Sequence, residues 1–154
     1  MESTTPDQYC VFHLDEDWFA VLATSVREID SRPEIVQFPK SSQHLVGLCH
    51  VRNEFIPVTE LTTEGQYENR KQMAVITSPG GTWAILIDEV VTLTSLDFSM
   101  SSSGDNNPLV AKAVMGTATY NGRIVRVFDV NAVYRELEKT LSQAWTTIPQ
   151  ESIS

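Results

Sequence analysis

The sequence predicts a mainly β protein in which one arrangement of strands is used twice, followed by a C-terminal α-helix. Two repeats indicate this fold class. Residues 47–61 recur 69 positions later as residues 116–130, and the pattern of residues 9–23 recurs about 65 positions later in residues 73–87. From Asn131 onward the apolar residues are spaced by three and four, which is typical of an amphipathic helix. An internal repeat of this kind implies that the same supersecondary unit is built twice.

Each half begins with a predicted β-hairpin. In the first half the acidic turn Asp15-Glu16-Asp17 divides the apolar stretch 9–23. In the second half the turn Ser78-Pro79-Gly80-Gly81 divides residues 73–87 in the same way. Apolar runs on both sides of a short turn are the usual pattern of a hairpin.

Each half also ends with a predicted hairpin. Residues 47–61 turn at Asn53, and residues 116–130 turn at Asn121-Gly122, a dipeptide that favours tight hairpin turns. The polar, aperiodic residues 62–71 are predicted to be the linker between the two halves.

The segment between the two hairpins of the first half, residues 25–40, is interrupted by Pro33 and Pro39. Because proline cannot donate to a sheet ladder, we expect an edge strand followed by an extended crossing segment. One helical turn, capped by a serine, is predicted at residues 41–45. The second half has a longer crossing and loop at residues 93–107.

We therefore predict a single domain over residues 1–154, with two pseudo-repeats at about 8–65 and 70–135. Terminal strands are free to cross over between the two halves. The C-terminal helix is predicted at residues 131–146, with Asn131 as its cap. Its apolar stripe is made by Val133, Tyr134, Leu137, Leu141, Ala144 and Trp145.

The composition limits the classes of partner. The formal net charge is −9, from 20 acidic and 11 basic residues, which disfavours binding to nucleic acid or anionic lipid. No apolar run is long enough to span a membrane, and the polar residues 1–8 do not resemble a signal peptide. Cys10 and Cys49 lie in apolar strands and are expected in the core rather than in a disulfide. These features predict a cytosolic protein.

Catalytic and metal-binding motifs are absent from the sequence. His13, His44 and His50 have no zinc-ligand or nucleophile spacing, and no phosphate-binding loop occurs. A Cys49-His50 dyad is disfavoured because neighbours on a strand point to opposite faces. We expect His13 and His50 to be half-buried strand residues.

The sharper catalytic alternative is a carboxylate pair at a pseudo-twofold axis. Glu60 and Asp129, or Asp88 with one of them, would form it, as in duplicated two-barrel hydrolases. The flanking sequences lack the Asp-Thr/Ser-Gly turn of such enzymes. These carboxylates are better explained as acceptors for backbone amides at strand ends and at the start of the helix.

Arg52 is the charged residue that most suggests binding. It lies between Val51 and the turn residue Asn53, so the chain holds its stem while its guanidinium can reach outward. The ordinary interpretation is an exposed turn arginine that pairs with Glu54. The second copy carries Asn121 at the matching position.

Residues 47–61 resemble the signature of the CheW family of chemotaxis coupling proteins, and the likeness extends over about residues 8–140. The matching motifs are Gly47, Arg52, Phe55-Ile56, Pro57-Val58, Leu61, Val26-x-Glu28-Ile29, Pro33, Pro39, Ile85-Leu86-Ile87-Asp88-x-Val90 and Gly116…Asn121-Gly122-Arg123…Phe128-Asp129. The departures from the family pattern are Asn53 for glycine, His50-Val51 for Asn-Leu and Glu60 for aspartate. Asparagine is the next most tolerant residue of a positive φ, so the first change is physically permitted.

The resemblance implies two small five-stranded β-barrels that share a hydrophobic interface. It also implies a scaffold without catalytic activity, cofactor or metal. The expected partners are the cytoplasmic tip of a methyl-accepting chemoreceptor and the regulatory domain of a CheA-type histidine kinase, in the cytoplasm at membrane-associated arrays. A coupling role in pilus motility or another non-flagellar pathway is the alternative.

The resemblance also assigns two binding surfaces. The receptor helix is expected in an apolar groove between the barrels. The receptor-binding positions carried over are Arg52, Asn53, Pro57, Ile87, Asp88 and Val90. The kinase-binding positions carried over are Cys10, Ala23 and Val26, for a flat contact on exposed strands.

Overall fold

The computed structural model describes residues 7–31, 33–37, 45–61, 70–100 and 112–147. The elements in this part of the chain are β1 (Gln8–Leu14), β2 (Asp17–Leu22), the 3-10 turn η1 (Ala23–Ser25), β3 (Val26–Ser31), β4 (Val36–Gln37), β5 (Leu45–Val51), β6 (Glu54–Thr59), β7 (Gln72–Thr77), β8 (Thr82–Ile87), β9 (Glu89–Ser95), β10 (Phe98–Met100), β11 (Val114–Tyr120), β12 (Arg123–Phe128) and helix α2 (Val130–Thr147). The predicted turn at 41–45 falls almost entirely outside the described residues. So do most of the 62–71 linker and the loop part of 93–107.

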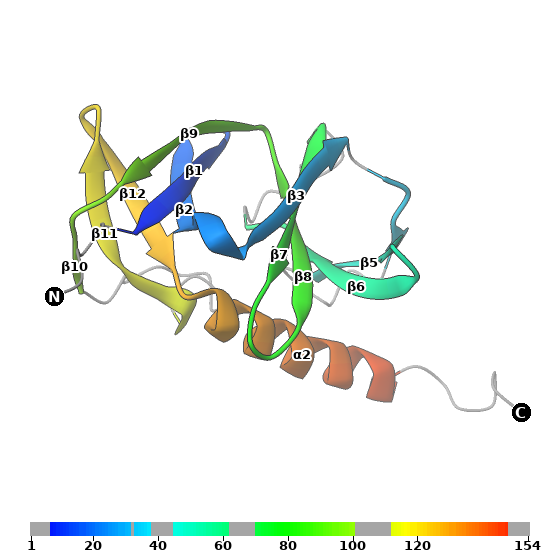
Figure 1. The fold of residues 1–154 in the computed structure, drawn as a ribbon. Helices are drawn as coiled ribbons and strands as arrows, with labels where there is room; N and C mark the ends of the chain where they lie inside the picture. Colours follow the sequence, from blue (N-terminus) through cyan, green and yellow to red (C-terminus); the bar gives the residue numbers. More distant parts are fainter. Residues whose placement is uncertain (1–6, 32, 38–44, 62–69, 101–111, 148–154) are drawn as a thin grey trace, which may run out of the picture.

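The strands form two sheets that lie side by side, with α2 running beneath them (Figure 1). The first sheet has the order β10-β11-β12-β2-β1-β9, and the second has the order β3-β7-β8-β6-β5-β4. Each contains five strands of six or seven residues and one short edge strand, β10 or β4. The predicted mainly β fold with two subdomains and a C-terminal helix is confirmed. Among the described strands, no pairing joins the two edges of either sheet.

The two sheets exchange hairpins between the halves of the chain. The β1–β2 hairpin lies in the sheet of β9–β12, while the β7–β8 hairpin lies in the sheet of β3–β6. The exchanged hairpins pair in the same way in both sheets. In the first sheet β2 is parallel to β12 and β1 is antiparallel to β9. In the second sheet β8 is parallel to β6 and β7 is antiparallel to β3. Neither half of the chain can therefore complete a sheet alone. The predicted edge strand after residue 25 is confirmed, because β3 lies at the edge of the second sheet.

A shared apolar core fills the space between the two sheets and α2. Cys10, Phe12 and Leu14 of β1 face this core, whereas Tyr9 and Val11 face a separate core of the first sheet. Strand β8 alternates in the same way, with Trp83, Ile85 and Ile87 in the shared core and Ala84 and Leu86 in the second sheet's own core. Central strands buried on both faces explain why these segments read as continuous apolar runs.

Both cysteines are free and buried, as the sequence predicted. Burial raises the pKa of the Cys10 thiol, and it raises the pKa of the Cys49 thiol to about 11. Both thiols are therefore protonated at neutral pH.

Helix α2 is capped by Asp129, not by Asn131 as the spacing suggested. The backbone N–H groups of Asn131 and Ala132 donate to Asp129 Oδ1 at 3.0 and 3.2 Å. A cap must precede the first helical residue, and Asn131 already lies inside the helix. Its side chain instead accepts a hydrogen bond from the Gly80 N–H at 2.8 Å.

The turn between β7 and β8 packs against the start of α2 (Figure 1). Trp83 Nε1 donates to the Val130 carbonyl at 3.0 Å, and the Tyr134 ring lies directly over Gly80 and Gly81. Val133 is buried in the shared core. The side chains of the predicted stripe beyond Leu141 are outside the described part of the chain.

We expect Gly81→Ala to lower the free energy of unfolding by about 1–3 kcal/mol, because overpacking forces its neighbours to move. The new Cβ would lie 2.5 Å from Tyr134 Cζ. Urea unfolding measures the loss. Gly122→Ala is the control: φ there is +77° and no atom lies within 4 Å, so only a backbone cost of about 1 kcal/mol applies. Adding Tyr134→Ala should remove the steric part of the destabilisation by Gly81→Ala. If the two substitutions changed the unfolding free energy by strictly additive amounts, this contact would be contradicted.

Candidate protein-protein interface

The turn between β5 and β6 carries Arg52 in an uncommon backbone conformation. Arg52 and Asn53 have φ values of 49° and 70°, which closely match the 50° and 77° of Asn121 and Gly122 in the β11–β12 turn. The prediction that Asn53 accepts a positive φ is confirmed. The positive φ of Arg52 was not foreseen, and for an arginine it costs about 1 kcal/mol.

Arg52 pairs with Glu28 of β3 rather than with its neighbour Glu54. Its Nε and Nη2 donate to the two carboxylate oxygens of Glu28 at 2.9 and 3.2 Å. This contact, with the adjacent Asp30 carboxyl, holds the pKa of Glu28 below its usual range. Glu54 instead lies 3.5 Å from Arg27 Nη1. The Arg52 side chain is still 70% exposed, so its guanidinium can reach a partner.

These ion pairs show that the second sheet is strongly curled. Strand β3 lies at one edge, and β5 is four positions away in the sheet order. A flat sheet would keep Glu28 and Arg52 far apart, because neighbouring strands are about 5 Å apart. Side-chain pairs therefore connect β3 to the tip of the β5–β6 hairpin.

The remaining receptor-binding positions divide into exposed and buried residues. Asn53 is exposed, and Asp88 and Val90 are half-buried. Pro57 and Ile87 are buried, and Ile87 is a member of the shared core. Their assignment as surface contacts is corrected, because β6 from Ile56 to Thr59 and β8 from Trp83 to Ile87 are runs of consecutive buried residues, covered on both faces.

The kinase-binding positions divide in a similar way. Ala23 in η1 and Val26 at the start of β3 are half-buried and keep accessible surface. Cys10 is only 3% exposed and points into the shared core. The expectation that Cys10 offers a contact surface is therefore corrected.

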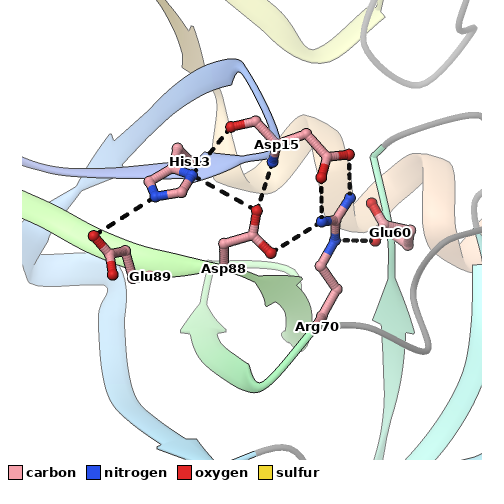
Figure 2. A network of polar contacts seen from close by, with 6 residues as sticks. All are labelled: His13, Asp15, Glu60, Arg70, Asp88 and Glu89. Atoms are coloured by element: carbon pink, nitrogen blue, oxygen red, sulfur yellow. Dashed lines mark hydrogen bonds and ion pairs between the residues drawn. The ribbon is translucent and has the colours of Figure 1, made fainter.

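Arg70, which sequence reasoning placed in a polar linker, is the centre of a buried ionic network (Figure 2). Its side chain is 2% exposed. Its Nε donates to Glu60 at 2.8 Å, and its Nη1 donates to Asp88 at 2.9 Å. Nη1 and Nη2 donate to the two oxygens of Asp15, both at 3.0 Å. These contacts raise the pKa of the Arg70 guanidinium further above its usual value.

The network joins three parts of the fold. Asp15 forms the β1–β2 turn, Asp88 connects β8 to β9, and Glu60 follows β6. Asp88 also accepts the Asp15 N–H at 2.6 Å, and His13 Nδ1 lies 3.6 Å from the same carboxylate oxygen. His13 is half-buried, as predicted, whereas His50, for which the same was expected, is exposed.

Glu60 and Asp129 bind different kinds of donor. The expectation that backbone amides donate to these carboxylates is confirmed for Asp129, and Glu60 accepts a hydrogen bond from the Arg70 side chain. A signal for Arg70 does exist in the sequence. Each carboxylate of the network is adjacent to a residue of the shared core: Leu14 precedes Asp15, Leu61 follows Glu60, and Ile87 precedes Asp88. Carboxylates held at a core require a cation.

Comparison with known proteins assigns the family. A model that describes the CheW-like domain matches residues 8–138. The chain belongs to the CheW-like domain family.

Fifteen chains of solved structures match this CheW-like chain. One is the crystal structure of scaffolding protein TtCheW from Thermoanaerobacter tengcongensis, with 16% identity and a TM-score of 0.70, covering 86% of this chain and 90% of that chain. At this identity the likeness shows the fold alone. The search of curated proteins gives no match.

The CheW-like family is not a family of enzymes, so the chain is not an enzyme and the alternative of a carboxylate-pair hydrolase is not supported. Within the described residues, no cluster of His, Cys, Asp and Glu could hold a metal ion. None of the described helices has the length and hydropathy of a membrane span.

We expect Arg70→Met to lower the free energy of unfolding by about 3–5 kcal/mol, because it leaves a buried carboxylate uncompensated. Glu60 is 4% exposed and would carry most of this cost. Adding Glu60→Gln should recover part of the loss. Arg135→Met on exposed α2 surface is the control, expected within about 0.5 kcal/mol of wild type in urea unfolding. Equal effects of the two arginine substitutions would contradict the network.

The stability that Asp15 contributes should be lost in acid. Hydrogen bonds from Arg70 hold the pKa of the Asp15 carboxyl below its usual range. Such a group stabilises the fold above its unfolded pKa and loses its effect as pH falls through the folded value. We expect the difference in unfolding free energy between wild type and Asp15→Asn to be constant above about pH 5 and to shrink below about pH 4. Urea titrations at successive pH values measure it, and a difference that persists in acid would argue against this pair.

Proposed function

We propose that the chain is a non-catalytic adaptor that couples chemoreceptors to a CheA-type histidine kinase. Its family supports a coupling role in chemotaxis-like signal transduction, and the TtCheW structure is named as a scaffolding protein. The adaptor would work in the cytoplasm and be recruited to membrane-associated receptor arrays. Its partners would be the receptor's cytoplasmic tip and the kinase's regulatory domain.

The observation that carries this proposal is the strained, exposed Arg52. The matching β11–β12 turn of the first sheet uses Asn121 and Gly122, which adopt positive φ at little cost. The β5–β6 turn retains an arginine there although asparagine would be more stable. Backbone strain that stability does not explain favours a binding role. A guanidinium at this position can pair with a carboxylate of an approaching helix.

Other residues would complete the two surfaces. Asn53 extends the exposed turn, and Asp88 and Val90 keep partial exposure where the chain crosses between the sheets. Pro57 and Ile87 would support the receptor surface from beneath. Ala23 and Val26 lie at the other crossing, and their small or β-branched side chains suit a flat contact with the kinase.

We expect Arg52→Glu to abolish binding to the receptor and to preserve binding to the kinase, because charge reversal at the edge of one interface weakens only that interface. Tagged wild type should recover both partners from a lysate of its own organism. Arg123→Glu, beside the equivalent turn of β11–β12, is the control and should recover both. Wild type that recovers neither a receptor nor a kinase would refute the proposal, and a pilus-associated receptor would identify the alternative pathway.

Arg52→Asn separates binding from folding. This variant should unfold at higher urea concentration than wild type, since the strain of about 1 kcal/mol is relieved and an exposed ion pair contributes little. It should also bind the receptor more weakly. A less stable variant with wild-type receptor binding would assign Arg52 a structural role only.

A further inference from the structure

We propose that Arg70 and Asp15 form a latch that sets the orientation of the two sheets, and that it opens at Asp15 while both sheets stay folded. The inference rests on the contacts of the network and not on the identity of any partner. It gives the protein a defined point at which its two sheets can move relative to each other.

The latch bridges the sheets where the covalent connections are few. Within the described residues, the chain passes between the sheets at η1 (Ala23–Ser25) and at Asp88. The tip of the β1–β2 hairpin belongs to the first sheet, whereas Arg70 immediately precedes β7 of the second sheet. The two hydrogen bonds from Arg70 to Asp15 therefore act between sheets (Figure 2). Because they are bidentate, they fix direction as well as distance.

The three carboxylates of the network differ in their exposure to water. Glu60 is 4% exposed and Asp88 is 26% exposed, whereas Asp15 is 53% exposed. If Asp15 withdraws, water can solvate it, and Arg70 keeps two carboxylate partners. The buried cation then remains compensated, so the large penalty for an unpaired buried charge does not arise. Withdrawal of Glu60 would incur that penalty.

Backbone contacts at the hairpin tip accompany the latch. Asp15 has a φ of 55°, in the left-handed region that aspartate adopts more readily than most residues. Its N–H donates to Asp88 at 2.6 Å, and the Asp88 N–H donates to the His13 carbonyl at 3.0 Å. Opening would therefore exchange the exposed Asp15–Asp88 contact at the hairpin tip for contacts with water.

The shared core limits how far the latch can open. Leu14, Leu61 and Ile87 adjoin the network and all belong to that core. Full separation would expose these apolar side chains to water, which the hydrophobic effect strongly opposes. The accessible motion is therefore a change of angle at the edge of the core.

Distances between spin labels test the latch in the full chain. One label pair spans the sheets, at exposed Thr119 of β11 and Thr77 of β7, and a second pair lies within the second sheet, at Ser31 and Thr77, each introduced as Xaa→Cys. The native thiols are buried and do not compete for label. Pulsed electron paramagnetic resonance then compares wild type with Asp15→Asn. The control is Asp17→Asn, an exposed aspartate on the same hairpin.

We expect Asp15→Asn to shift or broaden the distance distribution between sheets and to leave the distribution within the second sheet unchanged. Asp17→Asn should match wild type for both pairs. Identical inter-sheet distributions in the two variants would overturn the latch. A change in the within-sheet pair would also overturn it, because Asp15 would then act on folding in general.

Discussion

The apolar core shared by the two sheets is the interaction on which the rest of this structure depends. Strands β1 and β8 are buried on both faces, so each sheet needs the other to cover it. The exchanged hairpins follow from this constraint, because a hairpin donated to the opposite sheet ties both sheets to one core. The ion pairs of Arg70 lie at the edge of that core. Helix α2 runs beneath the two sheets (Figure 1).

Repeats and periodicity predicted the parts of the fold that local pattern determines. The four hairpins, the edge position of β3 and the helix after Asp129 each leave a period or a turn signal in the sequence. The hairpin exchange leaves none, because the same strands could pair within either half. The Arg52–Glu28 pair depends on sheet curvature, which periodicity does not encode.

The candidate site shows the same division between local and tertiary information. The turn geometry at Asn53 followed from its residue type. The burial of Ile87 and Cys10 depends on which side of each strand meets the shared core, and the burial of Pro57 depends on β6 being covered on both faces. Arg70 was missed because its flanking residues are polar, and only the contacts of distant carboxylates reveal its burial. The burial of such charges depends on tertiary contacts, so it is difficult to predict from a single sequence.

The proposed coupling role requires the chain to hold two partners at once, at the Arg52 turn and near η1. The most direct test is light scattering of purified wild type mixed with a receptor cytoplasmic hairpin and the kinase regulatory domain. The account predicts one complex that contains all three components. Displacement of one partner by the other, or binding of neither, would contradict it.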